Sequence, residues 1–151
     1  MSTRWLTVLL VALVGLAGCA PMDYPVPPEV TLVDLRPLDV SLFEQRMAVE
    51  LRIRNANDTA MEVTGLRFAL DVNGHAFAKG TSDRSVVVPR LADATTEGVA
   101  AVATTDLIRQ VMDAPEASGL RYRITGTMFL SGHRSLGFEQ DGDFTPPAKG
   151  N

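Results

Sequence analysis

Hydrophobic and polar residues alternate along most of the chain between residues 29 and 144. The clearest runs cover residues 47–54 and 66–72. A period of two is typical of a β-strand that has one buried and one solvated face. The pattern therefore predicts strands with two inward sets, Met47, Val49, Leu51 and Ile53 in the first run and Leu66, Phe68, Leu70 and Val72 in the second.

Turn signals separate these runs. Asn73-Gly74 ends the second run and favours a type I′ hairpin, because both central residues of that turn need a positive φ. Residues 76–79 would return from the hairpin. Asn55-Ala56-Asn57-Asp58 ends the first run with side chains that bond their own backbone. Further short strands are predicted over 30–43 with a break at Pro37, and over 85–88, 97–103, 120–130 and from 136 onward.

Residues 105–114 have a different pattern, with apolar residues at helical spacing, an N-cap at Thr105 and a stop at Pro115. We expect one short helix there. Seven to nine short strands together with this helix predict an all-β fold, an immunoglobulin-like or fibronectin-like antiparallel β-sandwich over residues 29–144. Residues 145–151 are rich in Pro and Gly and are predicted to form a flexible tail.

Residues 1–18 have the pattern of a signal peptide. Arg4 precedes an apolar run, Trp5 to Leu16, which at about a dozen residues is too short to span a hydrocarbon core of ~30 Å. Residues 19–28 hold four of the nine prolines, so we expect an extended tether that reaches roughly 25 Å.

The sequence Leu16-Ala17-Gly18-Cys19 resembles the bacterial lipoprotein box, in which small residues let a peptidase reach the bond before the Cys. The resemblance implies that Cys19 is acylated and attaches the mature protein to a membrane. Since Ala20 follows, where retention at the inner membrane commonly uses Asp, it implies the outer membrane, facing the periplasm. The alternatives are an ordinary secretory signal with an accidental Cys, or an uncleaved anchor.

Six segments between residues 29 and 103 form a recognisable set of strand and turn motifs. They are Val30-Thr31-Leu32-Val33-Asp34-Leu35, Asn55-Ala56-Asn57, Gly65-Leu66-Arg67-Phe68, Asp71-Val72-Asn73-Gly74, Phe77-Ala78-Lys79-Gly80-Thr81-Ser82 and Val87-Val88-Pro89. Together they resemble the late embryogenesis abundant type 2 family, whose module is the water-stress and hypersensitive-response domain. The family turn motifs fall on Asn55, Asn57, Asn73, Gly74 and Gly80, with Ala56 where the family usually has Pro. The resemblance implies an immunoglobulin-like β-sandwich, a role in the response to desiccation and no enzyme activity.

The composition narrows the function classes. The chain has 151 residues, a net charge of −4 and a single Cys, which excludes an internal disulfide framework and a zinc site of several thiolates. An acidic balance argues against nucleic acid as a partner. Loss of Arg4 with residues 1–18 leaves 13 basic against 18 acidic residues, a net charge of −5. Such a domain should not bind anionic head groups, so acyl chains would hold it at the membrane.

Few residues offer chemistry. His75 and His133 lie near turns without a second ligand at metal spacing, so no metal or other cofactor is expected. Ser135-Leu136-Gly137 resembles a nucleophile elbow, but His133 stands where that motif requires Gly.

Two charge patterns have alternative interpretations. Glu139, Asp141 and Asp143 alternate along one strand, either as a weak calcium patch or as a solvated edge that discourages strand pairing. Arg52 and Arg54, with Arg121 and Arg123, could form an anion-binding stripe if their strands are neighbours; otherwise they would make cross-strand ion pairs.

These features predict a non-catalytic, lipid-anchored periplasmic protein that shields envelope components from water stress. The alternative is an envelope interaction module that docks a protein partner through a sheet edge or an apolar face.

Overall fold

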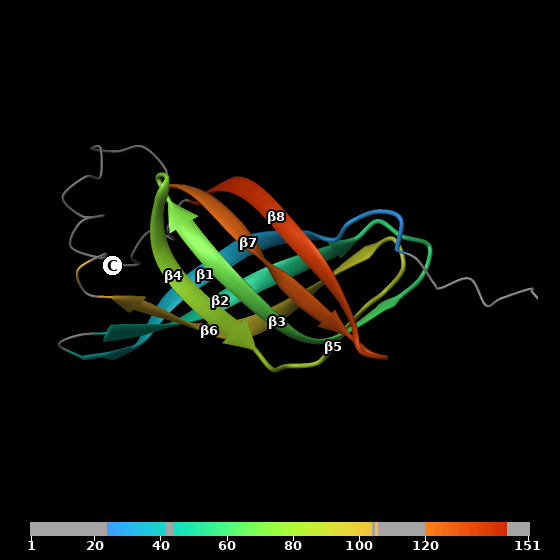
Figure 1. Ribbon diagram of the computed structural model, residues 1–151, viewed down its shortest axis with the longest axis horizontal. Coiled ribbons are helices and arrows are strands. Elements are labelled where there is room, and N and C mark those ends of the chain that lie inside the picture. Colours follow the sequence, from blue (N-terminus) through green and yellow to red (C-terminus); the bar gives the residue numbers. More distant parts are fainter. Residues whose placement is uncertain (1–23, 42–43, 104, 106–119, 145–151) are drawn as a thin grey trace, which may run out of the picture.

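The computed structural model describes residues 24–41, 44–103, 105 and 120–144. This part of the chain forms eight strands, shown in Figure 1. Their bounds are β1 (Glu29–Val40), β2 (Glu44–Asn55), β3 (Met61–Val72), β4 (His75–Ser82), β5 (Val86–Val88), β6 (Ala92–Ala103), β7 (Leu120–Leu130) and β8 (Arg134–Phe144). All the strand pairs are antiparallel, so the all-β antiparallel prediction is confirmed.

The strands form one continuous sheet in the order β1-β2-β6-β4-β3-β7-β8, with β5 paired to β3. Two separate sheets, as in an immunoglobulin-like sandwich, were expected; instead β6 pairs with both β2 and β4 and joins the two halves. The sheet curls so that β1 contacts β8, while β3, β7 and β8 cross over β1 and β2 in Figure 1. Within the described strands no backbone ladder joins β1 to β8, so a seam remains between the two edges.

The core fills the inside of the curl, as the alternation predicted. Val49, Leu51 and Ile53 of β2 are fully buried, and the four inward residues of β3 are buried as well. The intervening residues of these strands face outward and are mostly exposed, Arg52 and Arg67 among them. Contacts from β1, β6, β7 and β8 complete a single cluster, so the solvated faces all lie on the outside.

Two glycines let aromatic rings press against the sheet from inside. A Cβ on Gly80 would lie 2.8 Å from a ring carbon of Phe68 and 2.7 Å from the carbonyl oxygen of Val99. A Cβ on Gly126 would lie 2.5 Å from the ring of Phe138. Because real Cβ atoms do not approach so closely, the rings require glycine at both places, and the strands curve over them.

Several boundaries differ from those expected. Pro37 does not end a strand: β1 continues through it with irregularities in register at Leu32/Asp34 and Pro37/Asp39. Proline is tolerated there because β1 is an edge strand and needs no donor on its free side. The strand predicted from residue 97 begins at Ala92.

Some predictions concern residues that the structure does not describe. The signal peptide, the lipoprotein box with Cys19 and the tail at 145–151 lie outside the described residues, as does the predicted helix at 105–114 apart from Thr105. Among the residues it does describe, no helix is long and apolar enough to cross a membrane.

Candidate functional site

Asn55 and Asn57 are the centre of a buried hydrogen-bond cluster, which we call the asparagine knot. Asn55 is 1% exposed, and its Nδ2 donates to the carbonyl oxygens of Thr59 at 2.8 Å, Pro89 at 3.1 Å and Val88 at 3.4 Å. Its Oδ1 accepts from the backbone N–H of Asn57 at 2.9 Å and from Asn57 Nδ2 at 3.1 Å. An amide side chain supplies a nitrogen with two donor hydrogens and an oxygen acceptor at once, so the two asparagines close the end of the sheet around the loop after β5.

The second asparagine also binds the chain before β1. Asn57 Nδ2 donates to the carbonyl oxygen of Val26 at 2.8 Å, and Asn57 Oδ1 accepts from the N–H of Val26 at 3.0 Å. The Tyr24 hydroxyl donates to the carbonyl oxygen of Ala60 at 3.3 Å, and the Tyr24 ring lies 5.7 Å from the guanidinium carbon of Arg134. Residues 24–28 of the predicted tether are therefore held against the domain.

The hairpin at Asn73-Gly74 has the predicted geometry, with φ of 51° and 82°. The Asn73 N–H donates to the carbonyl oxygen of Arg121 at 2.8 Å, and Asn73 Oδ1 accepts from the Arg121 N–H at 3.3 Å. The hairpin thus ties β3 to the start of β7. The remaining family position, Gly80, is the contact point of Phe68 described above.

The acidic residues of β8 meet an arginine from the neighbouring strand. Arg123 lies 2.7 Å from Asp141 and 3.6 Å from Glu139. The hydrogen bond that Arg123 donates to Asp141, then the negative charges of Asp141 and Glu139, raise the pKa of Arg123 above its usual value. β8 is an edge strand, so the arrangement fits the solvated edge better than a calcium patch, and within the described residues no group of three potential ligands is close enough to hold a metal.

The anion stripe that was considered for four arginines is not formed. Arg52 and Arg54 lie on β2, whereas Arg121 and Arg123 lie on β7, and β6, β4 and β3 separate these strands in the sheet order. Arg54 instead comes within 4.0 Å of Glu29 on β1. The condition for the stripe, that the two strands be neighbours, is not met.

The histidines and the serine are also separated from one another. His75 starts β4 beside the hairpin, whereas His133 lies in the turn after β7 with φ of 62°. His75 is the register partner of Val72, which in turn pairs with Tyr122 at one end of β7. His133 precedes Arg134, which pairs with Leu130 at the other end of β7. Tyr122 and Leu130 are roughly 27 Å apart along the strand. The two histidines therefore cannot share a metal ion. Ser135 is exposed within β8, not at the strand-to-helix turn of a nucleophile elbow.

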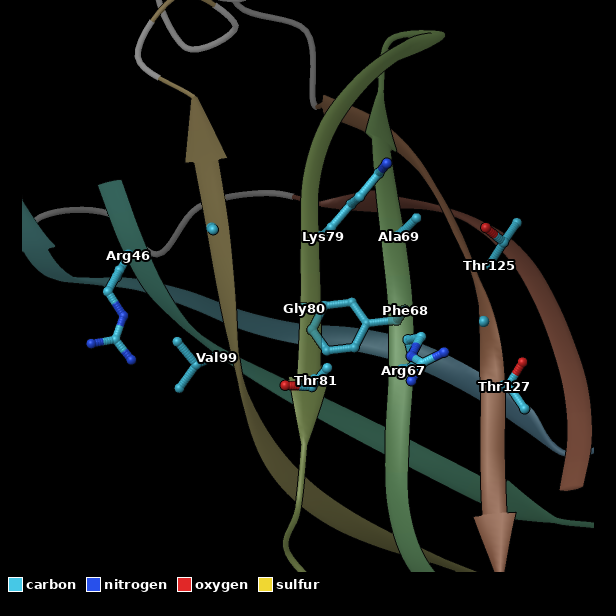
Figure 2. A pocket seen from close by; sticks show the side chains of 12 residues that line it. Arg46, Arg67, Phe68, Ala69, Lys79, Gly80, Thr81, Val99, Thr125 and Thr127 are labelled. Atoms are coloured by element: carbon cyan, nitrogen blue, oxygen red, sulfur yellow. The ribbon is translucent and has the colours of Figure 1, made fainter. Parts of the chain in front are cut away.

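A feature that sequence reasoning missed is a shallow depression on the outside of the sheet, which we call the outer groove (Figure 2). It has a volume of about 620 Å³ and crosses β2, β6, β4, β3 and β7. The lining contains three cations and no carboxylate, and it consists of Arg46, Arg67, Phe68, Ala69, Lys79, Gly80, Thr81, Val99, Ala101, Thr125, Gly126 and Thr127. The only available signal was the outward position of the charged residues and threonines of this lining, because their proximity depends on strand order.

Comparison with solved structures finds proteins that share the fold of this chain at low sequence identity. The solution structure of an Arabidopsis thaliana protein matches with a TM-score of 0.57 and 13% identity, over 87% of this chain and 91% of that one. A crystal structure of an Archaeoglobus fulgidus protein matches with a TM-score of 0.43 and 15% identity, over 78% and 98% of the two chains. No curated protein matches the chain by sequence.

Comparison with family models is more specific. The model described as late embryogenesis abundant protein, LEA_2, matches residues 50–142, which is more than half of the chain. The match reaches the last strands, where the motifs in the sequence gave little sign of the family, and it includes the asparagine knot, the hairpin and Gly80. The chain belongs to the late embryogenesis abundant protein family of type 2.

Proposed function

We propose that this protein is a non-catalytic, lipid-anchored member of the late embryogenesis abundant family, which protects the cell envelope when water is withdrawn. The family match carries the proposal, and the Leu16-Ala17-Gly18-Cys19 box supports the anchor. The proposed place is the outer membrane, with the domain in the periplasm and acyl chains on Cys19 as its contact with the lipid. Shielding would come from excluded volume and negative charge, which keep partly unfolded neighbours from meeting.

Both free edges of the sheet carry features that oppose aggregation. β1 contains Pro37 and two irregularities in register, and β8 presents Glu139, Asp141 and Asp143. Prolines, bulges and charges at edges prevent another chain from adding a strand. A protein that acts at high local concentration during drying benefits from such edges, because it must not aggregate with its own copies.

The anchor is tested by the Cys19→Ala variant of the full chain. In cells fed radiolabelled palmitate, the parent chain should incorporate label and fractionate with membranes, whereas the variant should do neither. Labelling of the variant, or a parent chain without label in the soluble fraction, would contradict the anchor.

The protective role is tested by drying. The purified full chain should preserve the activity of a labile enzyme through drying and rehydration better than the same mass of albumin does. Equal loss with both proteins would reject shielding. Deletion of the gene should lower survival after drying, and expression of the chain should restore it.

A docking module is the second candidate. The observation in its favour is a pair of exposed apolar side chains on and just after β5, since Val87 is 59% and Leu91 is 68% exposed. Such residues are candidates for a partner contact. A stoichiometric partner that co-purifies with the parent chain without stress, and is lost from the Val87→Ser variant, would favour docking over shielding.

A further inference from the structure

The outer groove gathers outward side chains from five strands in two adjacent rows. The first row runs Arg46, Ala101, Lys79, Ala69 and Thr125, because each is the register partner of the next. In the second row, Thr81 of β4 is opposite Arg67 of β3, which is opposite Thr127 of β7. The residues between the long charged side chains are small, and this leaves the depression. Gly80 and Gly126 have no side chain on the inner face of the sheet below it.

The cations of the groove differ from most others on the domain in having no acidic partner. Within the described residues, no carboxylate oxygen lies within 4.0 Å of the charged nitrogens of Arg46, Arg67 or Lys79. Arg67 stands 5.9 Å from the centre of the Phe129 ring. By contrast, Arg36, Arg84 and Arg123 are each paired with carboxylates. Among the described residues, the lining of the outer groove therefore holds three cations that no carboxylate neutralises at close range.

The flanking acidic residues lie outside the lining. Asp39 on β1 is the register partner of Arg46, and Glu139 on β8 is the partner of Thr125. Glu139 faces Arg123 at 3.6 Å. These two carboxylates therefore lie at the two ends of the first row of the groove.

The spacing of the cations indicates the kind of ligand. Lys79 and Arg67 are diagonal neighbours on paired strands, at about 7–8 Å, and Arg46 is two strands from Lys79, at about 10 Å. Figure 2 shows their side chains extending in different directions, so they do not converge on one ion. Thr81, Thr125 and Thr127 add hydroxyls that both donate and accept.

From this arrangement we infer that the outer groove binds a hydroxylated molecule that carries two or more phosphate groups several ångströms apart. The phosphates pair with Arg46, Arg67 and Lys79, and the threonine hydroxyls bond the scaffold between them. A volume of about 620 Å³ is in the range of small-molecule sites. The same chemistry occurs in soluble sugar phosphates and in phosphorylated lipid head groups.

Titration of the full chain in a non-ionic detergent tests the site, with fructose bisphosphate as the soluble probe. Mixed micelles of cardiolipin, which carries two phosphates joined by a hydroxylated glycerol, are the lipid probe. Isothermal titration at low salt should show binding that weakens as salt is raised. Binding of fructose bisphosphate supports the site with a soluble source, and binding of the micelles alone supports it with a lipid source. Binding of neither probe overturns the inference.

Charge-matched variants locate the binding. The Arg67→Gln/Lys79→Gln variant should bind the probe at least about tenfold more weakly, since a charge-assisted bond is worth about that factor. The Arg52→Gln/Arg121→Gln variant loses the same charge at exposed positions off the groove and should stay within about twofold. Equal weakening in both variants, with unchanged thermal unfolding, would mean that only net charge matters and would overturn the inference.

An uncharged variant and a gain of affinity complete the test. Thr127→Val keeps the charge and shape but removes a hydroxyl, so it should weaken the sugar phosphate more than inorganic phosphate. Asp39→Asn removes the carboxylate opposite Arg46 and should strengthen binding. Failure of both effects would contradict the assignment of these residues.

Discussion

Replacement of Asn55 by Ala should destabilise the domain more than almost any other single polar change. The side chain is 1% exposed, donates to carbonyls of Thr59 and Pro89 at 2.8 and 3.1 Å, and accepts twice from Asn57. Alanine would leave these groups unpaired in a buried site, at about 1–3 kcal/mol for each. Since water can enter the partly buried part of the loop, we expect a total loss of about 3–5 kcal/mol in the free energy of unfolding.

Urea denaturation followed by circular dichroism measures this loss. With an m value of about 2 kcal/mol per molar, the midpoint should fall by about 2 M. Asn55→Asp keeps an acceptor for Asn57 but directs a carboxylate oxygen at carbonyls, so it should be at least as destabilising. As a control, Asp58→Ala removes only the exposed pair with Arg90 at 2.9 Å and should lower stability by no more than about 0.5 kcal/mol.

The structural role of the knot would be refuted by a small effect. If Asn55→Ala lowers the free energy of unfolding by less than about 1 kcal/mol at an unchanged m value, the buried hydrogen bonds do not stabilise the native state as argued. A large loss in the Asp58→Ala control would show instead that the whole loop is sensitive to any change.

Three further changes test other parts of the sheet. Gly80→Ala should lower the free energy of unfolding by about 1–3 kcal/mol by overpacking, whereas Gly137→Ala, whose Cβ would meet only one atom at 3.9 Å, should be nearly neutral in the same urea assay. Tyr122→Phe removes the hydroxyl that accepts from the Leu32 N–H at 3.2 Å, so hydrogen exchange of that amide at the seam should become faster. The free energy of unfolding should fall by about 1–2 kcal/mol. An unchanged exchange rate would contradict this role of the hydroxyl. Leu91→Gly removes the strain of a φ of 52° at an exposed position, so it should raise the free energy of unfolding by up to about 1 kcal/mol and the melting temperature with it. A lower melting temperature would contradict the strain.

Local signals in the sequence predicted the local structure well. The alternation over residues 47–54 predicted the buried face of β2. Asn73-Gly74 predicted the hairpin between β3 and β4, because the ability to adopt a positive φ is a property of these two residues and needs no distant partner. The start of β6 was missed, since residues 92–96 contain no large apolar side chain. Pairing with β2, in which Asn55 is opposite Ala92, holds this segment in the sheet.

Features that depend on distant partners could not be predicted from pattern. Asn57 was identified as a turn residue, but its bonds to Val26 cross 31 positions of sequence. The outer groove needs Ala101 between Arg46 and Lys79, which follows only from the order of the strands. The same pairing of β6 with β4, over three residue pairs, produces one curled sheet where two were expected.

The bonds between Asn57 and Val26 have a mechanical consequence. β1 lies at the edge of the sheet and begins three residues after Val26. A pull on the N-terminal segment would otherwise unzip it from β2, one pair after another, beginning at Glu29 and Arg54. The bond from Tyr24 to Ala60 and then the bonds between Val26 and Asn57 receive that load first, and Asn57 transfers it to the end of β2, a strand flanked on both sides. Tension along the N-terminal segment is thereby diverted from an edge strand, which makes β1 less prone to peel away from β2.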